Sequence, residues 1–128
     1  MSKNEAKAEA MRYVSNAKEI LSEKGKKENG YYGDPKYIKM AGNTLWNGVL
    51  LALDHKFPEI KNGKGRPDQS KYRQAIKDGK ISKVFDSSYS QLHLVMGYDG
   101  VGDEKVVKIA IDNAKQIINW ATHDGRKS

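Results

Sequence analysis

The chain has 128 residues, no cysteine and a net charge of +7. Its length suits one domain, spanning residues 1–128, which can bury a core without disulfides. The lack of cysteine excludes disulfides, thiolate zinc sites and thiol nucleophiles. The N-terminus mixes charges of both signs and lacks the apolar core of a signal peptide, and the run VLLAL at 49–53 is far too short to span a bilayer. These features predict a soluble cytoplasmic protein.

The first predicted element is an amphipathic helix over residues 4–24. Apolar side chains recur there at spacings of three and four, which places them on one face of a helix. The pattern stops at Gly25, before the polar stretch KKENG. The residues on the predicted buried face are Ala6, Ala10, Tyr13, Val14, Ala17, Ile20 and Leu21.

A second helix is predicted to begin at Asp34-Pro35 and to stop at Pro58. Aspartate is a favoured N-cap and proline suits the first helical position. The segment LWNGVLLAL is apolar on almost every side, which is typical of a central helix. Gly42 and Gly48 inside it cost about 1 kcal/mol each relative to alanine. We therefore expect a neighbouring helix or the Trp46 ring to approach closely there.

The second half of the chain predicts three further helices. KNGKGRPD at 61–68 has the composition of a loop, and a short helix over about 68–78 is broken by Asp78-Gly79. A longer helix follows to Gly97, and the last helix starts with Asp103 as its N-cap. No stretch alternates in the manner of a strand. The sequence thus predicts an all-α fold, an antiparallel four-helix bundle with an additional short helix in the crossover between the second and third long helices.

The stretch GYDGVGD at 97–103 is interpreted as the connection between two helices. A left-handed Gly97 would close one helix, and Asp99-Gly100 is a common turn pair. Neither the spacing of a phosphate-binding loop nor that of a calcium loop is present. The alternative is a ligand site at one end of the bundle that would be lined by Tyr31, Tyr32, Tyr98 and Asp99.

No catalytic set is recognisable in the sequence. None of His55, His93 and His123 belongs to a HExxH motif or has a Glu three residues before it, so no metal site and no cofactor are predicted. The lack of a recognisable catalytic set favours a protein that is not an enzyme.

A different polar feature lies on the central helix, where a face that carries asparagine side chains could bond a neighbouring helix or form part of a ligand pocket. The candidate ligand-binding residues there are Asn43, Trp46, Asn47 and His93.

Positive charge is concentrated in one segment. Residues 61–83 carry 8 basic and 2 acidic side chains, a net of +6. Such a patch could attract phosphate backbones, although a solvated loop with a short exposed helix is the more common explanation. The candidate nucleic-acid-binding residues are Lys64, Arg66, Lys71 and Arg73.

Several stretches together resemble a known family. RYVSNAKEIL, KENGYYGDPKYIKMAGNTLWNGVLLALD and YSQLHLVMGYDGVGD, followed by a helix that ends IINW, are similar to the small bacterial family called domain of unknown function 5618 (DUF5618). The resemblance covers about residues 12–120. That family has no established activity, so the resemblance implies a fold more than a function.

A more distant likeness is to the helical domains named HEPN, for higher eukaryotes and prokaryotes nucleotide-binding. These are helical bundles, often dimeric, and many are ribonucleases. Their catalytic mark is an Arg followed four to six residues later by a His, and no histidine of this chain has it. The likeness therefore implies a helical bundle and dimerisation. The missing Arg–His pattern argues against ribonuclease activity.

The leading interpretation is a non-catalytic helical-bundle module that binds a protein partner or forms a homodimer. No association with a membrane is predicted. One alternative is a nucleotide- or nucleic-acid-associated HEPN-like protein that uses the basic 61–83 segment. A second alternative is a bundle that binds a small ligand.

Overall fold

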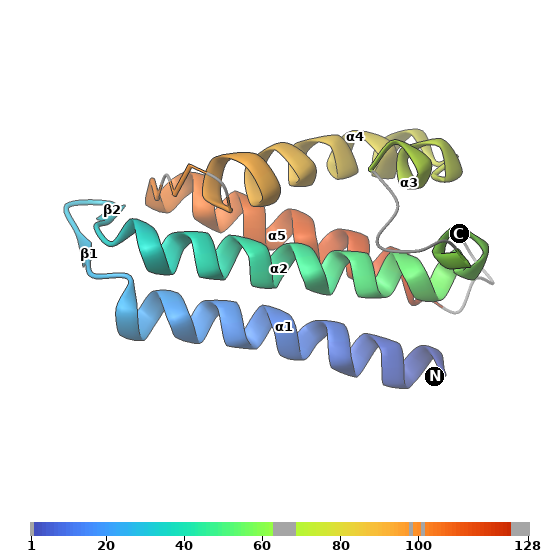
Figure 1. Ribbon diagram of the computed structural model, residues 1–128, viewed down its shortest axis with the longest axis horizontal. Coiled ribbons are helices and arrows are strands. Elements are labelled where there is room, and N and C mark those ends of the chain that lie inside the picture. Colours follow the sequence, from blue (N-terminus) through green and yellow to red (C-terminus); the bar gives the residue numbers. More distant parts are fainter. Residues whose placement is uncertain (1, 63–68, 98, 101, 124–128) are drawn as a thin grey trace.

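The structure is a computed structural model that describes residues 2–62, 69–97, 99–100 and 102–123. It is mostly helical, which confirms the all-α prediction. The four longest stretches of helix lie side by side, and each runs opposite to the one before it (Figure 1). In chain order the elements are α1 (Lys3–Lys24), β1 (Lys27–Glu28), β2 (Tyr31–Tyr32), α2 (Pro35–Lys56), the 3-10 helix η1 (Pro58–Asn62), α3 (Gln69–Ala75), α4 (Gly79–Ser88), the π-helix η2 (Tyr89–Met96) and α5 (Glu104–Ala121).

Local capping explains where α1, α2, α4 and α5 begin. The Ser2 hydroxyl accepts the backbone N–H of Glu5 at 3.1 Å, while the Glu5 carboxylate accepts that of Ser2 at 2.9 Å. This capping box lowers the pKa of Glu5, because hydrogen bonds from Ser2 stabilise its charged form. Asp34 and Asp103 cap α2 and α5 as predicted. Asp78-Gly79 separates α3 from α4 as predicted, and Asp78 in addition caps α4 by accepting the N–H groups of Lys80 and Ile81.

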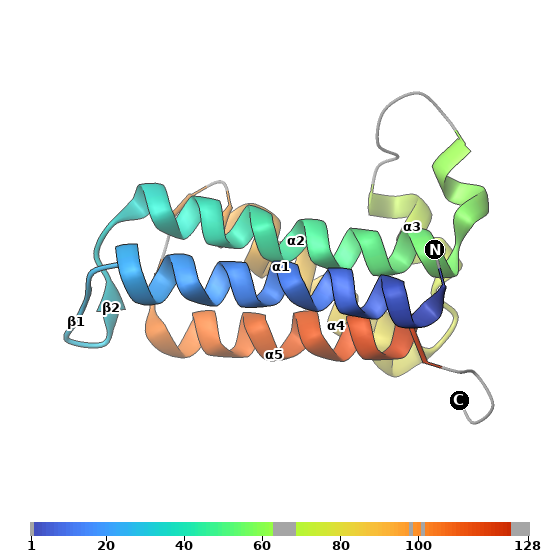
Figure 2. The ribbon, with the colours of Figure 1, turned by 90° about the horizontal axis from the view of Figure 1, so that it is seen from below.

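The core lies between three layers of helices. α2 and α5 form the middle, α1 covers one side, and α4 with η2 covers the other (Figures 1 and 2). α2 buries the most residues, from Ile38 to Asp54, as its apolar composition indicated. None of the helices in the described part of the chain combines the length and the apolar composition of a membrane-spanning segment.

The two glycines inside α2 allow the close approach that the sequence predicted. A Cβ at Gly42 would lie 2.7 Å from the Met96 Cβ and 2.8 Å from the Gly97 nitrogen of the segment that follows η2. A Cβ at Gly48 would lie 3.0 Å from the Tyr13 Cβ on α1. The helix propensity lost at these positions is offset by packing against two different neighbours.

A small hairpin was missed by the sequence analysis. β1 pairs antiparallel with β2, and Asn29 and Gly30 between them have φ values of 52° and 83°. Two consecutive positive φ angles are the signature of a type I′ hairpin turn, for which Asn-Gly is the preferred pair. The strands have only two residues each, too few for an alternating pattern to show.

The predicted continuous helix up to Gly97 is also corrected. After Ser88 the hydrogen bonding changes from α to π, and Gly97 donates its N–H to the Leu92 carbonyl, five residues earlier, at 2.9 Å. Gly97 was expected to be left-handed, but its φ is −69°. The left-handed glycine in this connection is Gly100, with φ +70°. A side chain at Gly97 is disfavoured for a different reason, since its Cβ would lie 2.5 Å from the backbone carbonyl oxygen of Leu92.

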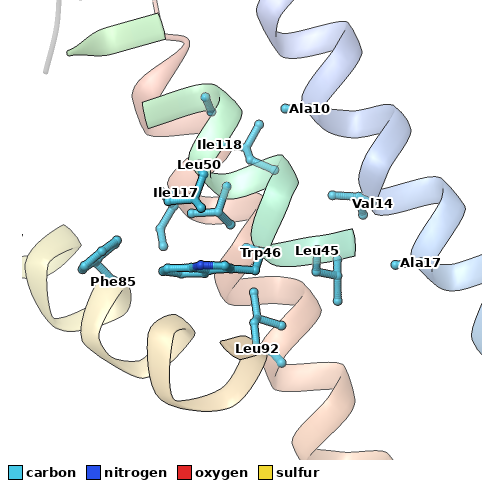
Figure 3. Close-up of a cluster of buried hydrophobic side chains, with 14 of the residues drawn as sticks. Ala10, Val14, Ala17, Leu45, Trp46, Leu50, Phe85, Leu92, Ile117 and Ile118 are labelled. Carbon is cyan, nitrogen blue, oxygen red and sulfur yellow. The ribbon is translucent and has the colours of Figure 1, made fainter. Parts of the chain in front are cut away.

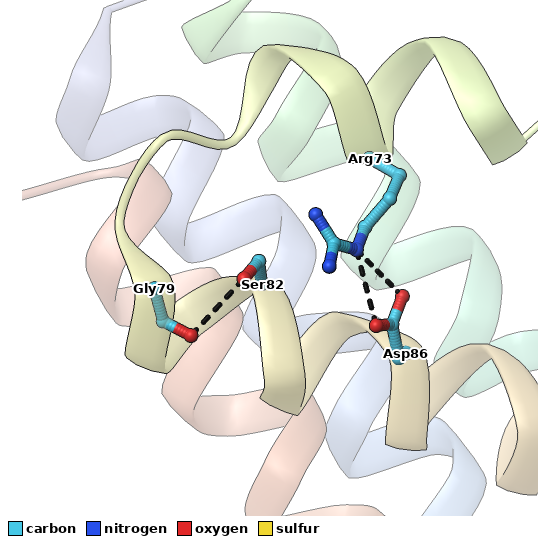
Figure 4. Close-up of polar contacts among 4 residues, drawn as sticks. All are labelled: Arg73, Gly79, Ser82 and Asp86. Carbon is cyan, nitrogen blue, oxygen red and sulfur yellow. Dashed lines mark hydrogen bonds and ion pairs between the residues drawn. The ribbon is translucent and has the colours of Figure 1, made fainter.

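The short helix predicted over 68–78 is present as α3, over a shorter range. Its Tyr72 is fully buried and donates its hydroxyl hydrogen to the Asp54 carboxylate on α2 at 2.6 Å. Arg73 Nε donates to both carboxylate oxygens of Asp86 on α4, at 2.9 and 3.1 Å (Figure 4). α3 is thus attached to two long helices through adjacent side chains.

Candidate functional site

A cluster of aromatic rings surrounds Trp46. Its ring centroid lies 5.7 Å from that of Phe85, 5.6 Å from that of Tyr89 and 6.0 Å from that of His93. Tyr89 and His93 stack on each other at 5.3 Å, one π-helical turn apart. Figure 3 shows the Trp46 ring pointing from α2 toward Phe85, with Leu92 and Ile117 on either side. These rings join α2 to α4 and η2.

The cluster brings two of the predicted ligand-binding residues together. Trp46 contacts His93 through their rings, but only 6% of Trp46 is exposed because its neighbours cover it. His93 and Asn47 are exposed. Trp46 therefore acts as a support beneath the surface that His93 belongs to.

Two exposed apolar side chains lie on the elements that meet at this cluster. Met40 on α2 is 44% exposed and Leu94 on η2 is 41% exposed. Asn43 on α2 donates its side-chain N–H to the Gly97 carbonyl at 3.4 Å, which links the two elements at their surface. We name this surface the α2–η2 seam and define it by the exposed residues Met40, Asn43, Asn47, His93 and Leu94.

The seam is unusual in its charge. Aspartate, glutamate, lysine and arginine make up 30% of the chain, yet none occurs from Met40 to Leu53 or from Ser87 to Gly97. Because Gly42 packs against Met96, these two uncharged segments meet in space. The sequence analysis missed the feature, although a search for long uncharged stretches would have found both halves. Only the packing shows that the two segments lie against each other.

The second predicted site lies at one end of the molecule. The β hairpin and the connection before α5 meet there, since Tyr32 donates its N–H to the Gly102 carbonyl at 2.8 Å. Tyr31 pairs with Asp103 in an isolated β-bridge, and its side chain is 57% exposed. Asp99 is exposed, and Tyr98 lies outside the described residues. The structure thus brings the two predicted loops together through their backbones.

The candidate nucleic-acid-binding residues are only partly described. Lys71 on α3 is exposed, and Arg73 beside it is engaged by Asp86. Lys64 and Arg66 lie outside the described residues. Within the parts of the chain that are described, no group of three or more His, Asp or Glu side chains is arranged to hold a metal ion.

The comparisons with known proteins concern the family. The model of the family named "Domain of unknown function (DUF5618)" matches residues 5–123. No curated protein matches the chain. A solved structure, of a protein of unknown function from Dyadobacter fermentans, is similar with 50% sequence identity and a TM-score of 0.87, over 95% of this chain and 97% of that one. Since the family model covers nearly the whole chain, the protein belongs to the DUF5618 family.

Proposed function

We propose that this protein is a non-catalytic binding module whose α2–η2 seam contacts the same seam on a second copy of the chain. The observation that carries the proposal is that the exposed residues of two segments that pack together, 40–53 and 87–97, include no Asp, Glu, Lys or Arg, in a chain of which 30% is charged. The cores of protein–protein interfaces are depleted of charged residues, which are costly to desolvate.

The proposal commits to a second copy as partner because an uncharged patch can meet a partner that carries the same net charge. Two copies that each carry +7 repel each other, and the repulsion grows where lysines and arginines face one another. A contact through the uncharged seam keeps those side chains at a distance. In a two-fold symmetric dimer the same patch meets itself, so a patch without charge faces no like charges.

The chemistry of the seam suits such a contact. Met40 and Leu94 supply apolar area, and methionine adapts to irregular partners because it is unbranched and flexible. Asn43 and Asn47 supply donors and acceptors that can pair across a two-fold axis. The ring cluster beneath, with Trp46 buried, holds the seam in one shape and reduces the entropy lost on association.

The arrangement that presents the seam is, in this proposal, an antiparallel four-helix bundle in which α4 and η2 form one rod. The seam then lies where the second and third rods meet. The support for this description is that α2 contacts α1, α5 and η2, while α4 contacts α5.

Sedimentation velocity over a range of protein concentrations tests the proposal. We expect reversible dimerisation at concentrations of about 1 mM or below, the weak end of specific association. Leu94→Lys places a charge in the seam, and symmetry doubles its effect because each copy contributes one. The dissociation constant should rise about tenfold or more, since like charges brought together at an interface oppose binding.

Ile109→Lys is the matched control. Ile109 on α5 is 51% exposed, lies outside the seam, and gains the same charge when replaced. It should leave the dissociation constant within about twofold, the effect of a distant surface charge in salt. A protein that stays monomeric throughout, or an equal effect of the two substitutions, would contradict the proposal.

A further inference from the structure

A groove lies between α1 and α5, on a different part of the surface from the α2–η2 seam. The two helices run side by side (Figure 2), and Tyr32 of the β hairpin lines one part of the groove. Its cavity volume is ≈ 320 Å³, at the lower end of the range for small-molecule sites. A ligand of a few carbon atoms, and not a macromolecule, suits that size.

The floor of the groove is apolar. Val107 on α5 is almost completely buried, and Ile111, one turn further, is half-buried. The half-buried Tyr32 adds an aromatic surface, and it packs against the core. A ligand with a small apolar body could remove these surfaces from water.

The rim of the groove is charged, with a net positive balance. Glu104 lines it but is already paired, since the Lys27 Nζ donates to the Glu104 Oε1 at 2.7 Å. The hydrogen bond to Glu104 and the attraction between the two charges raise the pKa of Lys27. The rim therefore presents two further ammonium groups, Lys18 and Lys108, and one further carboxylate, Asp112.

The two lysines are available to a ligand. Lys18 comes from α1 and Lys108 from α5, so the charges lie on opposite walls of the groove. Both are exposed, and among the described residues neither forms an ion pair within 4.0 Å. Lys18, Lys108 and Asp112 together carry one net positive charge, which one singly charged anionic group would balance.

We infer that this groove binds a small amphipathic monocarboxylate. Its carboxylate would lie between Lys18 and Lys108, and its short aliphatic or aromatic body would cover Ile111 and Tyr32. A single negative charge matches the rim, whereas a doubly charged phosphate would exceed it. The inference is independent of the seam, because it uses neither α2 nor η2.

The test is an NMR titration of the labelled protein at low ionic strength with hexanoate and phenylacetate. We expect saturable shifts of backbone amides around Tyr32 and the first half of α5. Acetate lacks the apolar body and hexanol lacks the charge, so both should bind at least about fivefold more weakly. Shifts that never saturate, or that fall outside the groove, would overturn the inference.

Charge-removing variants identify the contacts. Lys18→Gln and Lys108→Gln should each weaken hexanoate binding about three- to tenfold, as expected for the loss of one partly exposed ion pair. Lys83→Gln on α4 removes the same charge from a solvent-exposed position outside the groove and should change the affinity by less than about twofold. Equal effects of Lys83→Gln and Lys108→Gln would overturn the site.

Two other ligands test the proposed class. Leucine is a zwitterion of similar size to hexanoate. If leucine binds more tightly, Asp112 binds its ammonium group, and the assignment of a monocarboxylate is wrong. If phenyl phosphate binds more tightly than phenylacetate, the charge-balance argument is wrong. Weaker binding of both supports the inference.

Discussion

At the scale of single residues, Ser88 is the least expected feature of the core. It is fully buried at the last position of α4, where hydrogen bonding changes from α to π. In the part of the chain that the structure describes, its hydroxyl has no hydrogen-bond partner. A buried hydroxyl without a partner lowers the stability of the folded state, because it loses its bonds to water and gains none.

Replacing this hydroxyl should stabilise the protein. We expect Ser88→Ala to raise the free energy of unfolding by about 1 kcal/mol relative to Ser87→Ala, measured by urea denaturation. Ser87 is exposed in the same turn, so its replacement gives the same gain in helix propensity without removing a buried polar atom. A Ser88→Ala protein that is less stable than Ser87→Ala would show that the hydroxyl has a partner in solution.

Gly42 belongs to the same scale, because a single hydrogen in place of a methyl group sets the distance between α2 and η2. Gly42→Ala should lower the free energy of unfolding by about 1–3 kcal/mol, since its Cβ would lie 2.7 Å from the Met96 Cβ and 2.9 Å from the Leu92 carbonyl oxygen. The loss should appear despite the better helix propensity of alanine.

Gly79→Ala is the control for this prediction. A Cβ at Gly79, the first residue of α4, meets nothing within 4 Å. Thermal unfolding of this variant should occur at or slightly above the temperature of the parent protein. If both alanine variants are equally stable, α2 and η2 adjust easily and the contact is less tight than described.

At the scale of elements, α3 shows how a short helix is held by side chains rather than by its own length. Seven residues are too few for a stable isolated helix. Two of its attachments differ in burial, because the bond between Tyr72 and Asp54 is buried while the pair of Arg73 with Asp86 is exposed. The buried attachment should dominate, since exposed ion pairs contribute little.

Two substitutions on α3 separate these contributions. Tyr72→Phe should cost about 1.5–3 kcal/mol, the usual loss for a buried hydrogen bond to a charged group, and should speed amide hydrogen exchange in α3. Arg73→Gln should cost less than about 1 kcal/mol. The reverse order would mean that Asp86 and not Asp54 holds the helix.

The elements themselves were predictable to different degrees. The starts of α2 and α5 followed from Asp34 and Asp103, because a cap is a local interaction between neighbours in sequence. The Asn29-Gly30 turn was visible in the sequence but was not read as a hairpin. No local pattern in the sequence indicated the π-helix, since the spacing of its apolar residues also fits an α-helix. In the structure, η2 packs closely against Gly42 of α2.

At the scale of the whole molecule, the distribution of charge distinguishes the candidate functions. The basic segment 61–83 carries a net +6, and the α2–η2 seam carries no Asp, Glu, Lys or Arg. The first feature favours association with polyanions and the second favours contact with another protein surface. Both can exist in one molecule, but they respond oppositely to salt.

The nucleic-acid alternative leads to a prediction of its own. At low ionic strength we expect weak binding to a fluorescent single-stranded RNA, seen as increased anisotropy, that is lost at about 150 mM salt. Lys71→Glu should weaken it more than Arg73→Glu, because Asp86 already balances Arg73. Tight binding that persists at physiological salt would instead support a nucleic-acid function over the proposed dimer.

The sequence by itself determined the helical composition and the capped starts of α2 and α5, because these depend on residues a few positions apart. It also carried the motifs of the family. It placed Trp46 and His93 in one candidate site, and the structure does bring their rings into contact. Only the tertiary structure decided that Trp46 is covered and that two uncharged segments pack against each other. It also brought Lys18 and Lys108 to opposite walls of one groove. Such features join residues far apart in the chain, and their physical cause is the packing of whole helices, which no local pattern records.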